Sequence, residues 1–394
     1  MDMNPARHPD TASSAPDELA WTLPVYAQLN LHPVSGTGAW LVMADGRRIL
    51  DLYGGHAVAA LGYGHPRLVA ALHAQAQALT FQSNLLPLEL RARACAALAR
   101  FAPPGLDRVF LVNSGAEANE NALKLAFATP GRRRVVAVEG AFHGRTAAAA
   151  AVTWGSEKWY GFPQRPFEVS FVSPRDPAAL AHQVGAETAA LIVEPVQGVA
   201  GAVDMPAEFL AAARQATRDA GALLIFDEVQ CGMGRTGRPF GADYYGITPD
   251  IITTAKGLAG GFPAGALLTT HEIAAGLKIG ELGTTFGGGP MACAAIDTVL
   301  AVIRDEGLLD NVRTLSDRIR AACVVGPVTA IQGAGFLLGL VCSRPAKEIQ
   351  AELLEHDILA GTSADPHVLR LLPPFILEPE HVDRLAAALA EIAP

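Results

Sequence analysis

The run LLIFDEVQ at residues 223–230 is the stretch that decides the fold of this chain. Its apolar residues lead directly into an acidic pair, which is typical of a buried parallel strand whose carboxyl end carries a ligand-binding side chain. A second run, DIITTAKGLAGG at residues 250–261, places Lys256 between an apolar stretch and a glycine-rich turn. Both runs therefore predict strands that end at a functional side chain, Asp227 in one and Lys256 in the other.

The segments around these runs alternate between strand and helix patterns. Strands are predicted at 108–112, 134–138, 190–193, 222–226 and 250–254, with helices that include 116–128 and 207–220. This alternation predicts an α/β protein with a mostly parallel central sheet flanked by helices. The tail reads as a smaller α+β domain, with helices at 290–304, 310–322, 345–356 and 379–392 and strands near 328–341 and 367–371.

A hairpin at 38–53 and helices at 66–79 and 86–101 precede the alternating part. We expect the hairpin to complete the tail domain, so that both chain ends build the smaller domain. The predicted organisation is a disordered leader, an N-terminal segment of the small domain, a large domain and a C-terminal small domain, with bounds at 1–20, 21–65, 66–285 and 286–394.

Composition limits the classes of function. The chain has 394 residues, of which 50% are hydrophobic and 18% charged, so it is long enough for two compact domains. A net charge of -9 argues against a nucleic-acid or membrane-surface partner. The uncharged stretch 321–343 is broken by four glycines and a proline, so we expect buried strands there and no membrane helix. The N-terminus has no apolar core of a signal peptide.

The five cysteines are odd in number, widely spaced and without a CxxC pair. This pattern predicts a cytoplasmic protein with reduced thiols and no metal site. The histidines have no metal-ligand spacing either. No P-loop or serine nucleophile elbow is present. The run GMGRTG at 232–237 matches a dinucleotide fingerprint, but no helical pattern follows it, so we reject a nicotinamide or flavin site there.

Lys256 is one of only five lysines. A lysine amine in a desolvated site loses its proton more easily and can form a Schiff base, which an arginine cannot do. A solvated loop lysine is the simpler interpretation of Lys256 alone. Asp227 favours the functional interpretation, because an acid at a strand end suits the partner of a pyridinium nitrogen. Val229 and Gln230 follow at spacings that suit a ring face and a ring oxygen.

The run NSGAEANE at 113–120 lies where a predicted strand meets a helix. Small residues at a helix N-terminus expose backbone N–H groups to an anion, so Ser114, Gly115 and Ala116 suit a phosphate. An ordinary N-cap with Glu117 as its acidic partner explains the run equally well, and the two interpretations are compatible.

Four other positions suit ring or carboxylate recognition. Phe142 follows a strand end and suits stacking on a ring, while Arg145, three residues later, suits a carboxylate fork. Arg370 is a lone charge in an apolar strand and needs a partner. A substrate carboxylate would serve, and so would Glu194, which also ends an apolar strand. An ion pair between the two would then be a structural feature or a gate.

Six runs in this order resemble the class III pyridoxal-phosphate (PLP) aminotransferases, with the nearest likeness to the acetylornithine and succinylornithine enzymes. They are SGAEANE, FHGR, EPVQG, DEVQCGMGRTG, TTAKGLAGGFP and TTFGGGP. The resemblance covers about residues 25–392 and implies a PLP-dependent transferase fold of type I. It also implies a homodimer whose active sites are shared across the interface.

The resemblance implies a cofactor site as well. Lys256 would form the Schiff base and shuttle the proton, and Asp227 would pair with the pyridinium nitrogen. Val229 and Phe142 would pack on opposite ring faces, and Gln230 would bond the phenolic oxygen.

For the phosphate, the resemblance implies binding by Gly115 and Ala116 of one subunit and by Thr285 of the other. Thr284 would lie near the substrate.

The implied reaction moves the terminal amino group of N2-acetyl-L-ornithine to 2-oxoglutarate in arginine biosynthesis by a ping-pong cycle. Arg145 would bind the α-carboxylate of the amino donor. Arg370 would bind a carboxylate of 2-oxoglutarate or glutamate, with Glu194 masking it in the other half-reaction.

The substrate stays open between acetylornithine and N-succinylornithine, ornithine, 4-aminobutyrate or an N-acyl lysine. His56 stands where an apolar residue is common in such enzymes, and no arginine occurs in the segment 26–30. Both differences from the usual family pattern lie in segments that usually form the substrate pocket. A non-catalytic relative that keeps the fold as a scaffold is the alternative from another class, and the retained Lys256, Asp227 and Arg145 argue against it.

Overall fold

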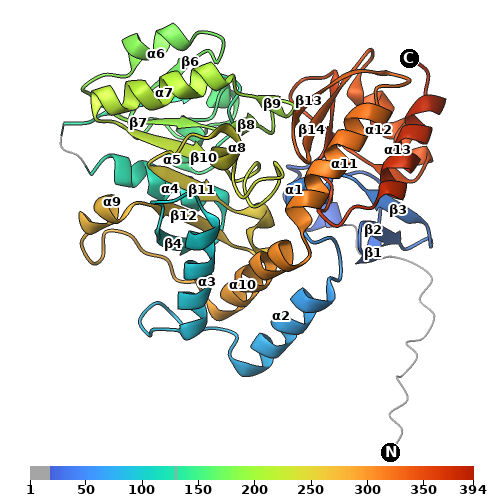
Figure 1. Cartoon of the computed structure of the whole chain (residues 1–394), viewed down its shortest axis with the longest axis horizontal. Coiled ribbons are helices and arrows are strands. Elements are labelled where there is room, and N and C mark those ends of the chain that lie inside the picture. The colour runs from blue at the N-terminus through green and yellow to red at the C-terminus, as the bar shows by residue number, and fades with distance from the viewer. Residues whose placement is uncertain (1–17, 129–130) are drawn as a thin grey trace, which may run out of the picture.

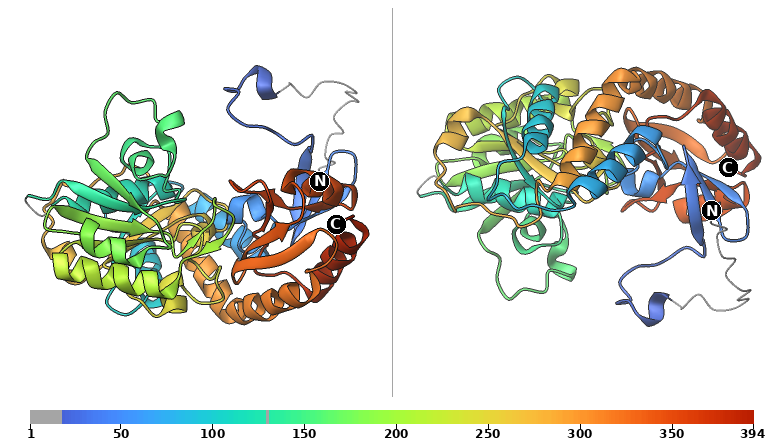
Figure 2. Two further views of the ribbon diagram at one scale, coloured as in Figure 1. Left: turned by 90° about the horizontal axis from the view of Figure 1, so that it is seen from above. Right: turned by 90° about the horizontal axis from the view of Figure 1, so that it is seen from below.

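The computed structural model describes residues 18–128 and 131–394. Two lobes lie side by side, one around a large sheet and the other formed by the C-terminal helices and the N-terminal hairpin (Figure 1). Figure 2 shows the same two lobes from above and below. The predicted leader lies mostly outside the described residues, and Glu18–Ala20 form a short 3-10 turn.

Seven strands form the sheet of the large lobe, in the order β4-β12-β11-β10-β7-β5-β6. The pairs β11–β10, β10–β7, β7–β5 and β5–β6 are parallel, and only β12 runs antiparallel to its neighbours. The strands are β4 Arg108–Val112, β5 Arg134–Val138, β6 Glu168–Val172, β7 Thr188–Val193, β10 Leu223–Asp227, β11 Ile251–Thr254 and β12 Gly265–Thr269.

Helices cover both faces of this sheet, because alternate strand residues point to opposite sides. Val135, Ile192 and Ile225 pack with residues of helix α4, whereas Leu224 and Phe226 pack with residues of helix α7. The large-lobe helices are α2 Pro66–Ala78, α3 Glu89–Phe101, α4 Gly115–Ala126, α5 Ala147–Ala151, α6 Pro177–Gln183, α7 Ala207–Ala220, α8 Gly241–Tyr245 and α9 His271–Ala275, with the 3-10 turns η2 Ser156–Lys158 and η3 Lys256–Ala259.

The second lobe holds two four-stranded sheets, ordered β1-β2-β3-β15 and β13-β14-β17-β16, and the small pair β8–β9 joins the lobes. Strand β15 pairs with β3, so both chain ends build this lobe, as predicted. Its elements are α1 Gly54–Ala57, α11 Leu308–Ala322, α12 Ala346–Glu355, α13 Pro379–Glu391, β1 Pro33–Thr37, β2 Trp40–Met43, β3 Arg48–Asp51, β8 Val196–Gln197, β9 Val203–Asp204, β13 Val328–Ala334, β14 Leu337–Cys342, β15 Ile358–Leu359, β16 Gly361–Thr362 and β17 Val368–Leu371.

The predicted elements are confirmed to within a few residues, and the helix at 207–220 is matched in full. The uncharged stretch 321–343 forms strands β13 and β14, as expected. No helix in the described part of the chain is long and apolar enough to span a bilayer. Helix α10 (Pro290–Asp305) packs on α2 and α3 and also on α11, so the boundary at residue 286 stays a prediction.

Candidate active site

A cavity of about 400 Å³ opens at the carboxyl ends of the central strands, where α/β sheets place their ligands. Its walls come from the N-terminus of α4 and from the loops that follow β5, β7, β10 and β11. Ten predicted site residues line it together: Ser114, Gly115, Ala116, Phe142, Arg145, Glu194, Asp227, Val229, Gln230 and Lys256.

Lys256 directly follows β11 and has a φ of +46°, in the left-handed region that side-chain-bearing residues rarely adopt. Such strain persists only where the surroundings fix it, and it is concentrated at functional sites. Burial lowers the pKa of the Lys256 amine from 10.5 to about 8, against the opposing charges of Asp227 and Glu194. The Lys256 amine therefore lies in a desolvating environment beside two acidic side chains.

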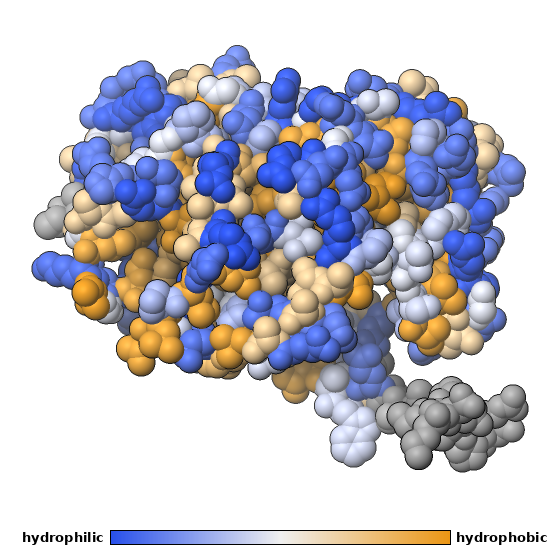
Figure 3. Space-filling view, turned by 60° about the horizontal axis from the view of Figure 1, so that its bottom comes forward, coloured by the Kyte–Doolittle hydropathy of each residue, from blue (hydrophilic) through white to orange (hydrophobic). Residues whose placement is uncertain are grey.

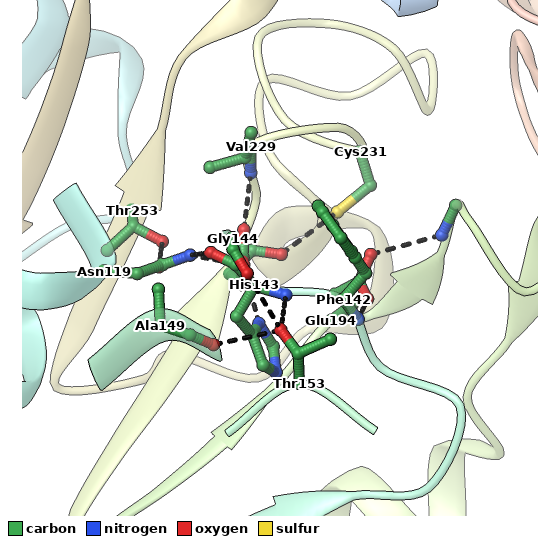
Figure 4. Close-up of polar contacts among 12 residues, drawn as sticks. Asn119, Phe142, His143, Gly144, Ala149, Thr153, Glu194, Val229, Cys231 and Thr253 are labelled. Atoms are coloured by element: carbon green, nitrogen blue, oxygen red, sulfur yellow. Dashed lines mark hydrogen bonds and ion pairs between the residues drawn. The ribbon is translucent and has the colours of Figure 1, made fainter. Parts of the chain in front are cut away.

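Asp227 ends β10 and is 3% exposed. Its Oδ2 accepts hydrogen bonds from Asn119 Nδ2 at 2.7 Å and lies 2.7 Å from His143 Nδ1 (Figure 4). Oδ1 accepts from the Val229 backbone N–H at 3.0 Å. Asn119 also accepts from Thr253 Oγ1 at 2.6 Å. This network fixes the orientation of the Asp227 carboxylate.

The N-terminus of α4 forms one wall. Ser114 Oγ accepts from the Glu117 N–H at 3.2 Å, which confirms the predicted N-cap. The first N–H groups of a helix have no partner inside it, so those of Gly115 and Ala116 are available at the cavity. A Cβ on Gly115 would lie 2.8 Å from both methyl groups of Val229, so the close approach of α4 to this loop requires glycine.

Glu194 follows β7 and lies on the opposite wall. Its oxygens accept from the backbone N–H groups of Phe142 at 2.8 Å and Gly198 at 3.2 Å. Burial, with the charge of Asp227 as the next cause, raises the pKa of Glu194 to about 7. The carboxylate thus holds the loop that carries Phe142 against the cavity.

Arg145 lines the cavity and is exposed to it. Its guanidinium carbon lies 4.6 Å from the centroid of the Trp159 ring and 5.8 Å from that of Phe142. Stacking on two aromatic faces orients the planar fork while leaving its N–H donors available to an anion.

The ion pair between Arg370 and Glu194, one of the two alternatives that the sequence left open for Arg370, does not form in this structure. Arg370 donates from Nε to Thr362 O at 2.8 Å, from Nη1 to Gly198 O at 3.0 Å and from Nη2 to Tyr53 Oη at 2.7 Å. Both oxygens of Glu194 are taken by backbone N–H groups, so the two side chains meet only through Gly198, which bonds each of them.

Thr284 and Thr285 lie outside this cavity, in the loop before α10. Thr284 Oγ1 accepts from Asn113 Nδ2 at 3.3 Å and from the Gly287 N–H at 3.1 Å, which fixes the loop beside the wall residue Asn113. Thr285 is exposed. The chain therefore presents Thr285 outward, away from its own Lys256.

Three polar residues of the site were missed from the sequence. Asn119 and His143 lie inside quoted runs, and their signal was a polar side chain at a position that should be buried. Tyr53 follows a strand end at Asp51, which is the same signal that identified Asp227. The rejected run 232–237 forms turns, and its Arg235 is 1% exposed and donates to backbone carbonyls.

Comparison with known proteins identifies the class. The class III aminotransferase family matches residues 24–393, and the chain belongs to this family. An acetylornithine aminotransferase of Streptomyces coelicolor is 44% identical and covers 93% of this chain and 92% of its own. An acetylornithine/succinyldiaminopimelate aminotransferase of Yersinia pestis is 39% identical, over 94% and 95%. The solved ornithine aminotransferase of Toxoplasma gondii has a TM-score of 0.88 at 29% identity, over 94% and 91%.

Enzymes of this class depend on pyridoxal phosphate, and the site offers what that group needs. An acid lies ready for a ring nitrogen, helix N–H groups for a phosphate, and a desolvated amine for an aldehyde. Gln230 Oε1 is buried without a hydrogen-bond partner, as a group awaiting a ligand would be. The residues therefore fit the cofactor.

Proposed function

We propose that this enzyme moves the terminal amino group of N2-acetyl-L-ornithine to 2-oxoglutarate, giving N-acetylglutamate 5-semialdehyde and glutamate, in arginine biosynthesis. The observation that carries the proposal is the pairing of Lys256 and Asp227 in one buried cavity with Arg145 at its mouth. Relatives named acetylornithine aminotransferase, 37% to 44% identical over most of the chain, support the donor. Five free thiols support a cytoplasmic location.

When bound, the cofactor supplies a ring that withdraws electrons from the substrate. This makes it easier to remove the proton from the substrate carbon that bears the amino group. Asp227, fixed by Asn119 and His143, would pair with the ring nitrogen. Lys256 would hold the cofactor between turnovers and would move the proton at the substrate carbon, since a pKa of about 8 lets the amine both accept and donate a proton near neutral pH.

The remaining wall residues position the ring. Gly115 and Ala116 offer N–H groups to the phosphate, beside the Ser114 cap. Val229 and Phe142 would pack on the two ring faces and exclude water from the reacting carbon. Gln230 would bond the ring oxygen, which would give its unpartnered Oε1 a partner.

The two substrates would be recognised by different arginines. Arg145 would bind the α-carboxylate of the amino donor, because its stacked fork presents two parallel N–H donors. This requirement weighs against 4-aminobutyrate as the donor, since its carboxylate lies one carbon closer to its amino group than the α-carboxylate of N-acetylornithine does. Arg370 would bind a carboxylate of 2-oxoglutarate or glutamate. Glu194 would mask it in the other half-reaction, since the two side chains already bond the N–H and the carbonyl of the same residue, Gly198.

We further propose a homodimer with shared active sites. Large apolar side chains are exposed around the loop before α10, including Phe81 at 41%, Leu85 at 87% and Phe286 at 65%. Figure 3 shows apolar side chains gathered on the lower part of this face. A second hollow of about 470 Å³, lined by Phe81 and Phe286, shares Asn113 with the cavity. A partner seated there would bring its own Thr285 to the phosphate.

N-succinylated donors are the second candidate, because the Yersinia pestis relative is named for succinyldiaminopimelate as well as acetylornithine. Purified enzyme with added cofactor would be given 2-oxoglutarate and, in turn, N-acetylornithine, N-succinylornithine, N-succinyldiaminopimelate, ornithine and 4-aminobutyrate. Glutamate formation would be measured by mass spectrometry. The proposal predicts the highest kcat/KM for N-acetylornithine, and a higher value for another donor would replace it.

A further inference from the structure

The turn at α1, residues 54–57, has an unusual backbone beside the active site. Four successive residues have positive φ, at +54°, +56°, +63° and +70°. The first two are glycines, but His56 and Ala57 have side chains that disfavour this region. A left-handed run that includes two residues other than glycine is strained. Such strain persists where the surrounding structure fixes it, and it is concentrated at functional sites, so the side chains that this turn positions are candidates for a functional role.

Buried groups hold this turn in place. Asp51 Oδ1 accepts from the backbone N–H groups of Tyr53 at 2.8 Å and Gly54 at 2.9 Å, and Oδ2 accepts from Tyr63 Oη at 2.5 Å. The Tyr53 ring lies on the backbone of Gly361, where a Cβ would come within 1.9 Å of the ring. The ring position is therefore fixed by packing as well as by the turn.

A chain of hydrogen bonds leaves the turn through the Tyr53 hydroxyl. Arg370 Nη2 lies 2.7 Å from Tyr53 Oη, which lies 2.8 Å from His56 Nδ1. A guanidinium can only donate, so the tyrosine oxygen accepts from Arg370 and its single hydrogen goes to His56. His56 Nδ1 must then be unprotonated. Burial and the charges of Arg370 and Lys256 lower the pKa of His56, which keeps the ring neutral.

A count of donors shows what this arrangement does to Arg370. A guanidinium has five N–H groups. One goes to Thr362 O, one to Gly198 O and one to Tyr53 Oη. One N–H remains on each terminal nitrogen, and such a pair forms the fork that binds a carboxylate through two parallel hydrogen bonds.

We propose that Tyr53, supported by His56, is a positioning residue that orients the Arg370 fork for the carboxylate of a dicarboxylic amino acceptor. This inference rests on the proposed function and deepens it. The neutral Tyr53 hydroxyl accepts one hydrogen bond from the Arg370 guanidinium, so the positive charge of Arg370 remains available to a substrate carboxylate. A carboxylate partner such as Glu194 would neutralise that charge and compete with the substrate. Acceptor recognition thereby depends on the strained turn at residues 54–57.

The test separates the acceptor from the donor. Tyr53→Phe keeps the ring on Gly361 and removes only the hydroxyl. Because hydrogen bonds to charged groups are strong, we expect the KM for 2-oxoglutarate to rise about tenfold or more. kcat and the KM for the N-acyl donor should change less than about twofold. Tyr244→Phe, a half-exposed tyrosine on α8, is the matched control and should behave as wild type.

Two variants of His56 test the direction of the hydrogen bonds that run from Arg370 through Tyr53 to His56. His56→Ala removes the acceptor and should raise the 2-oxoglutarate KM several-fold. His56→Asn restores an acceptor and tolerates positive φ, so it should recover most of the affinity. Equal changes in donor and acceptor kinetics, or no change in either, would overturn the assignment and leave Tyr53 as a packing residue.

A binding measurement distinguishes this inference from the proposed function. Glutarate, a dicarboxylate that cannot accept an amino group, would be titrated into the holoenzyme by calorimetry, with Arg370→Ala as the reference for lost binding. A Kd raised about tenfold in Tyr53→Phe supports the positioning role, and an unchanged Kd contradicts it. If the wild type transfers no amino group at all, the proposed function fails, and the glutarate titration still decides the role of Tyr53.

Discussion

The depressed pKa of Lys256 predicts how fast the apoenzyme takes up its cofactor at different pH values. Only the neutral amine attacks an aldehyde. With a pKa of about 8, a fraction of about 9% is neutral at pH 7 and about 91% at pH 9. With the ordinary value of 10.5, the neutral fraction at pH 7 would be only about 0.03%. The attachment rate should therefore rise about tenfold from pH 7 to pH 9 and then level off.

The assay mixes apoenzyme with pyridoxal phosphate, quenches with borohydride at timed intervals and quantifies the modified Lys256 peptide by mass spectrometry. N-acetyl-lysine methyl ester, which has an amine of ordinary pKa, is treated in the same way. Dividing the two rates at each pH removes the effect of the ionisation of the cofactor. If the two amines are equally accessible, Lys256 should react with the cofactor roughly 300-fold faster than the reference amine at pH 7. This ratio of rates should shrink as the pH rises.

Two variants test the sign of the electrostatic contributions. Arg370→Gln removes a positive charge that lowers the Lys256 pKa, so its pH midpoint should move upward. Glu194→Gln removes a negative charge that raises the Lys256 pKa, so the pH midpoint of the attachment rate should move downward. A rate that climbs about 100-fold between pH 7 and pH 9 without a plateau, as an exposed lysine would give, would refute the desolvated amine.

Three further outcomes are expected. Gly115→Ala should weaken cofactor affinity at least tenfold in an equilibrium titration, because a Cβ there meets two methyl groups at 2.8 Å, whereas Gly185→Ala, with nothing within 4 Å, should not. Asn119→Ala should lower the unfolding free energy by about 1–3 kcal/mol in urea titrations, since it leaves buried partners such as Asp227 unsatisfied; an unchanged value would remove Asn119 from the network. Phe286→Glu should yield monomers with greatly reduced activity in sedimentation and turnover assays, and an active monomer would exclude shared sites.

The sequence predicted the parts of the site that follow from strand ends. Asp227 and Lys256 each end an apolar run, and a parallel sheet brings such ends to one edge. The N-cap at Ser114 was equally local, because it depends on a residue three positions away. For the same reason the strand and helix bounds of the large lobe were close.

The partner of Arg370 could not be predicted in this way. Its acceptor Tyr53 is 317 positions away and lies directly before the left-handed turn at residues 54–57. The sequence shows two glycines there but gives no sign that His56 shares their conformation. Glu194 was the plausible partner by charge alone. The structure assigns it instead to two backbone N–H groups, which satisfy a buried carboxylate without another side chain.

The central claim is that this chain is an aminotransferase whose Lys256 and cofactor accept the amino group of an N-acylornithine. Single-turnover absorbance of the holoenzyme tests it most directly. With N-acetylornithine and no 2-oxoglutarate, we predict loss of the visible cofactor band and about one semialdehyde per site, followed by recovery of the band when 2-oxoglutarate is added. Lys256→Ala should show no such cycle. Holoenzyme whose band is unchanged by every N-acylornithine would contradict the account.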